Sequence, residues 1–401
     1  MNTGKNALLL AIILCFFILS VSCDHDVTGQ EPVVTDPIPD PEPEPEEPAC
    51  LESGTHADIN ALLTAENVIV ELCPGSVFEL SDRIEINHSG QQIYTHGRPV
   101  DETRAVLKIV SETLSSAVIM RDFDYALLSH VVVDGNRPEL GYRGGDALIY
   151  AGGSSRGQVI RYVDIIEPRS WSALQLIQGH PSPAPPCQNA LVEHNVIGPA
   201  GEYDGTWADG ISLACTNSIV RNNRITDATD GGIVIFDAPG SVIENNIITA
   251  DTRVLLGGIN MVDYGPYEGN YYGTIVQNNI IDAKGSTIRI AIGMGTRVWV
   301  CVDRDYDLTL KGATVINNLL RGEHMQFGYI ADGVENWKVT DNESEATHSG
   351  NPTIDCYGRT ASPPAAFMYN PERVSGTFQP EFSEADLELA LWSIVDPVPG
   401  E

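Results

Sequence analysis

The chain has 401 residues, of which 42% are hydrophobic and 19% are charged, and its formal net charge at pH 7 is −32. This acidic balance argues against binding to nucleic acid or, by charge, to anionic lipid, because both are polyanions. It also disfavours a strongly anionic polymer, unless calcium or a local group of arginines offsets the negative field.

The N-terminus predicts an export signal. Lys5 precedes an apolar run, residues 7–19, that is too short to span a membrane comfortably. Ser22 and Cys23 follow, and a small residue before a cysteine at this point resembles the cleavage box of bacterial lipoproteins. We expect residues 1–22 to be a lipoprotein signal peptide. A lipid on Cys23 would hold the protein in the bacterial cell envelope, at the outer membrane or the periplasmic side of the inner membrane; an ordinary signal peptide with an incidental cysteine is the alternative.

Residues 23–49 are predicted to be a linker. They contain the run DPIPDPEPEPEEP, in which proline and acidic residues alternate. Such a run cannot bury a core, and it stays extended at about 3 Å per residue where polyproline II geometry holds. We interpret it as a stiff, soluble tether without a chemical role.

Six cysteines remain once the signal peptide and Cys23 are set aside. An even number in an exported chain favours disulfide bonds over metal ligands, and no pair has the spacing of a zinc site. Of the 15 arrangements that six cysteines allow, we expect the one that joins sequence neighbours: Cys50–Cys73, Cys187–Cys215 and Cys301–Cys356.

A pattern of paired polar residues between apolar ones recurs along the middle of the chain. Its copies read LVEHNVI, IVRNNRI, VIENNII, IVQNNII and TVINNLL, and they begin at Leu191, Ile219, Val242, Ile275 and Thr314. A second short apolar segment lies between the copies, beginning at Ala173, Gly210, Gly232, Gly258 and Ala291. A repeat of this size, with two or three short strands per unit, indicates a β-solenoid.

The asparagine pairs have a structural interpretation. Each turn of a solenoid is too small to bury its own core, so stacked turns pair in parallel at about 4.8 Å and inward Val, Ile and Leu fill the axis. Asparagine tolerates the left-handed conformation of a sharp bend. One asparagine per coil can then stack on the next and satisfy its amide in a buried ladder.

Two further segments resemble the right-handed parallel β-helix of the pectin-lyase-like superfamily. Residues 59–80, INALLTAENVIVELCPGSVFEL, look like the start of that fold, with an amphipathic capping helix, a first strand and a Pro-Gly turn. Thr55 and Asp58 fit a capping box for the helix, and VVVDGNR at residues 131–137 is a common phrase there. The resemblance implies an all-β, single-stranded right-handed parallel β-helix over residues 50–345. It does not specify an activity, because the superfamily holds lyases, hydrolases, epimerases and adhesins.

Residues 346–401 are predicted to be a C-terminal extension, because the repeat fades after residue 345. The segment SEADLELALWSIV from Ser383 predicts a short helix with its own capping box, covering the open end of the solenoid. We expect a monomer.

Alternation within the segments between the asparagine copies separates inward from outward side chains. The period of two predicts these inward pairs: Leu174/Leu176, Ile211/Leu213, Ile233/Ile235, Ile259/Met261 and Ile292/Met294. The outward positions are Gln175, Ser212, Val234, Asn260 and Gly293. Because this face is poor in ionisable groups, we expect chemistry at its rims.

Asp209, Asp230 and Arg289 lie at the leading rim, with Trp207 just before the first aspartate. Carboxylates on adjacent coils can lie about 5 Å apart, near enough to perturb each other's pKa. Such a pair can act as general acid and base, or bind calcium. Ordinary turn chemistry at a strand start is the alternative for both aspartates.

The order of these residues is similar to that in the polygalacturonase family, where paired aspartates cleave a glycosidic bond and an arginine and a lysine hold the uronate. This chain departs from the pattern, because the two aspartates fall one residue out of register. It also has Asp230-Gly231 for a double aspartate, Leu256-Gly257-Gly258 for Gly-His-Gly, and Ala291 for the lysine.

Asp237 and Asp263 lie at the trailing rim and are predicted to stack, with Arg297 on a later coil. Aromatic residues crowd the adjacent loop: Tyr264, Tyr267, Tyr271 and Tyr272, with Trp299 nearby. Acids beside exposed aromatic rings suit sugar binding, because rings stack on sugar faces while carboxylates accept hydroxyl hydrogen bonds. A loop that packs down on the solenoid is the alternative.

The sequence therefore predicts an exported, lipid-anchored protein that acts on a polysaccharide or oligosaccharide, as a glycoside hydrolase or a polysaccharide lyase. Lyases on this fold commonly pair calcium-binding acids with a basic residue, for which the candidates are Arg253, Arg289, Arg297 and Lys284. His180 is a further candidate for the site, whereas His194 stands in the asparagine column and is interpreted as a core or ladder substitute. A non-catalytic glycan-binding or structural surface protein is the alternative from another class.

Overall fold

A computed structural model divides the chain into two units, residues 1–48 and residues 49–401. It describes residues 50–177, 187–202, 205–263, 265–299, 308–350 and 364–385. The predicted signal peptide, the tether and Cys23 lie outside the described residues. So do His180, Tyr264 and the predicted Cys301–Cys356 bond. The second unit is described below.

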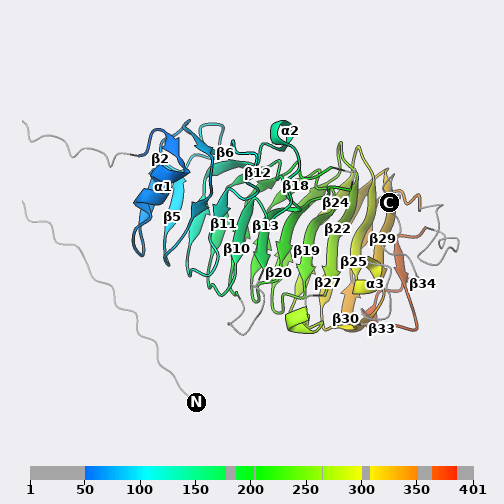
Figure 1. The fold of residues 1–401 in the computed structure, drawn as a ribbon. Helices are drawn as coiled ribbons and strands as arrows, with labels where there is room; N and C mark the ends of the chain where they lie inside the picture. The colour runs from blue at the N-terminus through cyan, green and yellow to red at the C-terminus, as the bar shows by residue number, and fades with distance from the viewer. Residues whose placement is uncertain are drawn as a thin grey trace, which may run out of the picture. The chain divides into compact units, whose positions relative to one another are not determined.

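The second unit is built from three sheets of parallel strands, and successive coils lie side by side (Figure 1). Each coil gives one strand to sheet A, the next to sheet B and the next to sheet C, as β2 (Ile69–Leu72), β3 (Val77–Leu80) and β4 (Ile84–Glu85) do. The predicted parallel β-helix is confirmed.

Sheets A and B meet at the bend that carries the asparagine pairs. After β2, sheet A contains β5 (Gln92–Thr95), β8 (Leu127–Ser129), β11 (Val159–Arg161), β14 (Leu191–Glu193), β17 (Ile219–Arg221), β20 (Val242–Glu244), β23 (Ile275–Gln277), β26 (Leu310–Lys311), β27 (Thr314–Ile316), β30 (Val334–Thr340) and β33 (Val374–Phe378). Besides β3, sheet B contains β1 (Gly54–Thr55), β6 (Ala105–Ile109), β9 (Val131–Asp134), β12 (Asp164–Ile166), β15 (Val196–Ile197), β18 (Arg224–Thr226), β21 (Ile247–Thr249), β24 (Ile280–Ala283), β28 (Leu319–Gly322) and β31 (Glu343–Ser344).

Sheet C has the longest strands and carries the candidate site. After β4 it contains β7 (Val118–Ile119), β10 (Ile149–Gly152), β13 (Ser172–Ile177), β16 (Asp209–Leu213), β19 (Gly231–Phe236), β22 (Leu255–Val262), β25 (Ile288–Met294), β29 (Met325–Ala331), β32 (Phe367–Tyr369) and β34 (Ser383–Glu384). The ten side chains predicted to point inward from β13, β16, β19, β22 and β25 all belong to the main hydrophobic core, whereas Val234 from the outward row is buried but lies outside that core. The inward alternation is therefore confirmed.

A ladder of buried asparagine side chains follows the bend between sheets A and B. In each step the side-chain amide donates to the Oδ1 atom of the next asparagine at 2.9–3.0 Å, through Asn195, Asn223, Asn246, Asn279, Asn318 and Asn342. The first asparagine of each pair has a left-handed backbone, with φ of 55–56° at Asn222, Asn245, Asn278 and Asn317. The structural interpretation of the pairs is confirmed.

His194 occupies the left-handed column and not the buried ladder, with φ of 56°. Its ring is exposed and stacks on Tyr162 with 5.0 Å between ring centroids, and Tyr162 stacks on His130 at 4.8 Å. His194 therefore replaces the first asparagine of a pair, on the surface and outside the core.

The N-terminal end is closed by helix α1 (His56–Leu62). The predicted capping box is present, because the Thr55 side chain accepts from the amide of Ala57 at 3.2 Å and Asp58 accepts from the amide of Thr55 at 2.7 Å. The Asn60 side chain also bonds main-chain groups of Arg83 and Glu85, which holds β4 at the edge of sheet C. Two of the predicted disulfides, Cys50–Cys73 and Cys187–Cys215, are confirmed.

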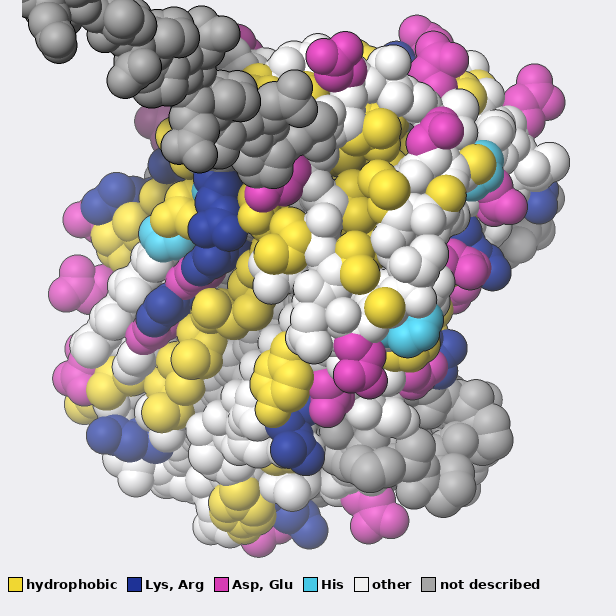
Figure 2. Space-filling view, turned by 90° about the vertical axis from the view of Figure 1, so that its left-hand side faces the viewer, with side chains coloured by type: hydrophobic (Ala, Val, Ile, Leu, Met, Phe, Trp, Pro, Cys, Tyr) yellow, Lys and Arg dark blue, Asp and Glu magenta, His cyan; other side chains and the backbone are white. Residues whose placement is uncertain are grey.

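The outer surface near this end carries interspersed charges, with basic side chains beside acidic ones (Figure 2). On sheet A, Glu193 pairs with Arg221 at 2.8 Å and with Arg161 at 3.9 Å. On sheet B, Arg104 donates to Asp164 at 2.8 Å. Since these arginines face carboxylates, they do not form the uncompensated basic surface that nucleic acid requires.

The C-terminal part differs from prediction. Strands β32, β33 and β34 continue the ladders beyond residue 345, because β32 pairs with β29, β33 with β30, and β34 with β32. The helix predicted to begin at Ser383 is wrong at its start, where Ser383–Glu384 form β34; residues 386–401 lie outside the described part.

Besides α1, the described ranges contain three short helical segments outside the sheets: α2 (Arg137–Leu140), the 3-10 turn Gly265–Tyr267, and α3 (Thr296–Trp299). No helix within the described ranges is long and apolar enough to cross a membrane.

The ladder predicts a specific sensitivity to mutation. The Asn246 side chain is fully buried and takes part in four hydrogen bonds, so Asn246→Ala leaves the amide of Asn223 and the carbonyl of Val220 without partners. We expect this variant to lose about 1–3 kcal/mol for each group left unsatisfied, and to melt at a clearly lower temperature. Asn245→Gly is the control, because glycine accepts the positive φ of this exposed position. Equal melting temperatures for the two variants would contradict the ladder's role.

Candidate functional site

The outer face of sheet C carries a row of side chains that sequence alternation predicted. Strand pairing sets Gln175 beside Ser212, Ser212 beside Val234, and Val234 beside Asn260. These side chains do not form an open surface, because they are buried; Asn260 is only 1% exposed. The Asn260 amide lies over Gly257 and reaches toward Asp209 across Gly231, since neither glycine has a side chain to fill this space. Its two polar atoms have no hydrogen-bond partner among the described residues.

Asp209 lies on this face at the start of β16 and is 3% exposed. Its carboxylate accepts from the Ser212 hydroxyl at 2.7 Å and from the Gly231 amide at 3.0 Å, and Ser212 in turn lies 2.9 Å from the Ser172 hydroxyl. Burial, and then the charge of Asp230, raise the pKa of Asp209 well above its usual range, against the two hydrogen bonds.

Asp230 stands on the next coil, directly before the glycine whose amide holds Asp209. The β16–β19 register pairs Ile211 with Ile233, so the two aspartates are one residue out of register, as the sequence predicted. Burial raises the pKa of Asp230 to about 7, and this side chain is partly exposed. The Asp230 carboxyl group can therefore bind and release a proton near neutral pH, and it is the more exposed member of the pair.

Trp207 and Arg289 border the aspartates. Trp207 is partly exposed and packs on an outer apolar cluster that includes Leu256 and Ile290. Arg289 follows Leu256 in the same row as Asp230, two strand spacings or about 10 Å away. Its guanidinium donates to the Gln326 side chain at 3.3 Å. The predicted leading rim is thus assembled on one face, with Arg289 two strands along the sheet from Asp230.

The trailing rim is arranged differently. The β19–β22 register places Asp237 beside Asp263, as predicted, but Asp237 is fully buried and accepts from the Gly269 amide at 3.2 Å. A carboxylate with no exposed surface cannot meet a polysaccharide, so Asp237 holds the loop that follows β22. Asp263 is partly exposed, and burial raises its pKa.

The aromatic loop divides between core and surface. Tyr271 is fully buried and its ring is tilted against that of Trp337, with 5.5 Å between the centroids. Its hydroxyl lies 2.6 Å from the Ile235 carbonyl and 2.8 Å from the Val262 carbonyl, so it packs onto the solenoid. Tyr267 is partly exposed and Tyr272 is exposed. The side chain of Trp299 lies outside the described part of the structure.

The remaining basic candidates lie at different places. Arg253 pairs with Glu167 at 2.8 Å and donates to the Gly201 carbonyl, and Lys284 pairs with Asp251 at 3.3 Å on the surface. Arg297 is partly exposed on α3, with its side chain near Gly333. None of these contacts brings a basic side chain onto Asp209 or Asp230.

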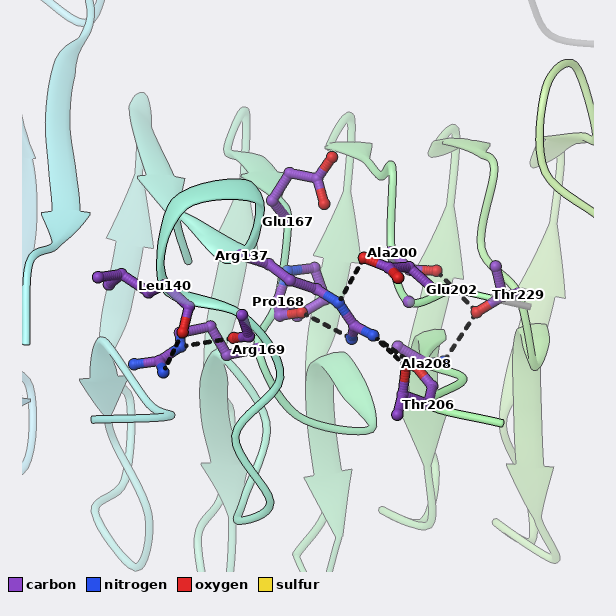
Figure 3. A network of polar contacts seen from close by, with 12 residues as sticks. Arg137, Leu140, Glu167, Pro168, Arg169, Ala200, Glu202, Thr206, Ala208 and Thr229 are labelled. Carbon is purple, nitrogen blue, oxygen red and sulfur yellow. Dashed lines mark hydrogen bonds and ion pairs between the residues drawn. The ribbon is translucent and has the colours of Figure 1, made fainter. Parts of the chain in front are cut away.

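The loop that leads into Asp209 is held by a polar network that the sequence did not reveal (Figure 3). Arg137 is 2% exposed; it donates to the carbonyl of Thr206 at 2.8 Å and to its hydroxyl at 2.5 Å, and lies 3.6 Å from Glu202. Thr229 accepts from the Ala208 amide and donates to the Ala200 carbonyl, both at 3.0 Å. Thr229 thus holds this loop from the following coil, and Arg137 holds it from α2, two coils before.

Arg169 holds two further loops, near residues 111–114 and residues 140–141. Its guanidinium is buried and donates to five main-chain carbonyls: Ser111, Glu112, Leu114, Leu140 and Gly141. Arg137 and Thr206 are 69 residues apart in sequence. No local pattern marks either arginine, because its partners come from other coils.

Comparison with known proteins defines the fold. A family model described as the right-handed beta helix region matches residues 184–300. The protein is a right-handed parallel β-helix. This agrees with the predicted resemblance to the pectin-lyase-like proteins at the level of fold.

Solved structures similar to this β-helix include an alginate lyase from Paenibacillus sp. str. FPU-7, at 15% identity and a TM-score of 0.51, covering 74% of this chain and 96% of that chain. They also include the tailspike protein of E. coli bacteriophage HK620 in complex with a pentasaccharide, at 13% identity and a TM-score of 0.51, covering 82% of this chain and 60% of that chain. The β-helix therefore spans about 60% of the tailspike's length. A comparison with curated protein sequences gives no match.

Metal binding stays a prediction for this β-helix. Within the described ranges, no group of three or more His, Cys, Asp or Glu side chains is arranged to hold a metal ion.

The raised pKa of Asp230 predicts how stability depends on pH. A carboxyl group with a pKa of about 7 in the folded protein and 3.8 as its ordinary value binds its proton more tightly when folded. Its contribution to stability is therefore complete below about pH 4 and is lost as the pH rises through about 7. We expect the melting temperature of the wild type to fall by a few degrees more between about pH 5 and about pH 8 than that of Asp230→Asn. Glu244→Gln on sheet A is the control, and identical pH profiles for wild type and Asp230→Asn would refute the assignment.

Proposed function

We propose that this protein cleaves a polysaccharide at the Asp209–Asp230 pair. The observation that carries the proposal is the pair itself: two aspartates on adjacent coils of the outer sheet C face, one buried and one partly exposed, with raised pKa values. Glycosidic bond cleavage needs a carboxyl group that is protonated near the working pH to protonate the leaving oxygen.

The two carboxyl groups have different roles in this proposal. Asp230 is the catalytic residue, because it is the exposed member and its pKa of about 7 suits both donation and return of a proton. Asp209 is a positioning residue that lies beneath it, held by Ser212 and the Gly231 amide. Trp207, partly exposed over the same face, offers a ring for a sugar unit.

The comparisons support a carbohydrate ligand. One similar structure is named an alginate lyase, and another is a tailspike solved with a pentasaccharide. Both are likenesses of fold, so the reaction proposed for this chain depends on its own aspartates.

The test is a cleavage assay of the purified protein on a polysaccharide panel, with and without EDTA. We expect new reducing ends, a loss of about 10²–10⁴-fold in rate for Asp230→Asn, and a smaller loss with an altered pH profile for Asp209→Asn. Glu244→Gln should keep full activity. Ultraviolet absorbance of an unsaturated uronate would identify a lyase instead of a hydrolase, and glycan binding without cleavage would leave a non-catalytic binding protein.

We also propose that the protein is exported and anchored in the cell envelope through a lipid on Cys23. The support is the sequence of residues 7–23, an apolar run followed by a small residue and a cysteine. Cys23→Ser should move the protein from the detergent phase to the aqueous phase of a cell extract, because the acyl chains supply the membrane affinity. Cys15→Ser is the matched control. Detergent-phase partition of Cys23→Ser would exclude lipidation at this position.

A further inference from the structure

A groove separate from the aspartate pair lies on the outer face of sheet C, at its N-terminal end. It has a volume of about 440 Å³ over strands β4, β7 and β10, and its lining includes Glu85, Asn87, Ile119, Arg121, Asp146 and Tyr150. We call it the N-terminal groove. Its volume falls within the range of small-ligand pockets. The Asn60 side chain, from α1, fixes its outer edge by bonding the main chain on both sides of Ile84.

The groove and the aspartate pair share one sheet face. Strand pairing sets Glu85 beside Ile119, Ile119 beside Tyr150, and Tyr150 beside Gln175, which begins the row that passes Ser212. From Tyr150 on β10 to the strand that follows Asp230, β19, there are three strand spacings, or about 14 Å. The separation of the two places is therefore within the length of a glycan of several linked units.

The groove combines an aromatic ring with groups that bind hydroxyls. Tyr150 is half-buried, and the Arg121 guanidinium lies 5.2 Å from the centre of its ring. Asn87, Glu85 and Asp146 are exposed at the groove and accept hydrogen bonds. A ring beside several hydroxyl-binding groups suits a sugar unit.

The charges of the groove exclude an anionic sugar as its preferred ligand. The two arginines face carboxylates, with Arg83 at 2.6 Å from Glu85 and Arg121 at 3.8 Å from Asp122. Asp146 adds a further negative charge to the lining. The chain as a whole carries −32, so the surrounding field also repels a polyanion.

We propose that the N-terminal groove binds neutral sugar units of the glycan that is cleaved at the aspartate pair, so that the substrate is a neutral polysaccharide. The position of cleavage rests on the proposed function, whereas binding in the groove does not.

Binding is tested by calorimetry on Asp230→Asn, which prevents turnover, with neutral hexasaccharides of glucan, mannan, xylan and galactan type and with uronate hexasaccharides. We expect a neutral hexasaccharide to bind, with little dependence on salt. In the Asp230→Asn background, Tyr150→Ala should weaken binding by roughly tenfold, the loss of about 1.4 kcal/mol of ring contact. Tyr150→Phe keeps the ring and should bind nearly as well, which separates ring stacking from misfolding. Tyr125→Ala, an exposed tyrosine outside the groove lining, should have no effect.

The outcomes separate this inference from the proposed function. Exclusive binding of uronates, absence of binding to every neutral glycan, or unchanged affinity of Tyr150→Ala would overturn the inference. Neutral glycan binding that depends on Tyr150, in a wild-type protein that cleaves nothing, would uphold the groove and defeat the proposed cleavage. Cleavage of a uronan at a rate unchanged by Tyr150→Ala would uphold the proposed cleavage and overturn the inference about the groove.

Discussion

Coil-to-coil hydrogen bonding is the constraint on which the rest of this structure depends. A single coil cannot satisfy its own backbone groups, so each strand needs its neighbours in the parallel sheets. The asparagine ladder adds a side-chain contact of 2.9–3.0 Å at the same place in each step from Asn195 to Asn342. Because the ladder is buried and continuous, it sets the register of every coil that it joins. Loops elsewhere can then lengthen without disturbing the stacking.

That fixed register explains how the candidate site is assembled. Asp209 and Asp230 come from different coils and lie one residue apart in register, yet the Gly231 amide ties them together. The offset gives them different surroundings, since Asp209 is buried and Asp230 is partly exposed. Two chemically identical side chains thereby acquire different access to a ligand, which a catalytic pair requires. The same row of strands carries the N-terminal groove, so one face offers both reaction and binding.

The trailing rim shows where reasoning from the sequence reached its limit. Asp237 and Asp263 occupy equivalent positions on neighbouring coils, and the same role in sugar binding was predicted for both. Asp237 has a left-handed backbone and is buried beneath the loop that it holds through Gly269. Tyr271 from that loop enters the core, although it stands in a run of tyrosines that look equivalent. Which side chains of a long insertion point into the core depends on their contacts with other coils.

Sequence patterns were enough to predict the β-helix, its capping box, two disulfides, the inward residues of sheet C and the asparagine ladder. The strands and the asparagine pairs repeat with the coil, the capping box is a local motif at one helix, and the two disulfides join cysteines that are sequence neighbours among the cysteines, 23 and 28 residues apart. The tertiary structure was needed to find which aspartates share one environment, that Ser383 begins a strand, and that Arg137 and Arg169 hold loops of other coils. The arginine contacts join residues 69 and 58 positions apart. Burial and hydrogen bonding at such distances depend on how the coils stack, and no local pattern encodes them.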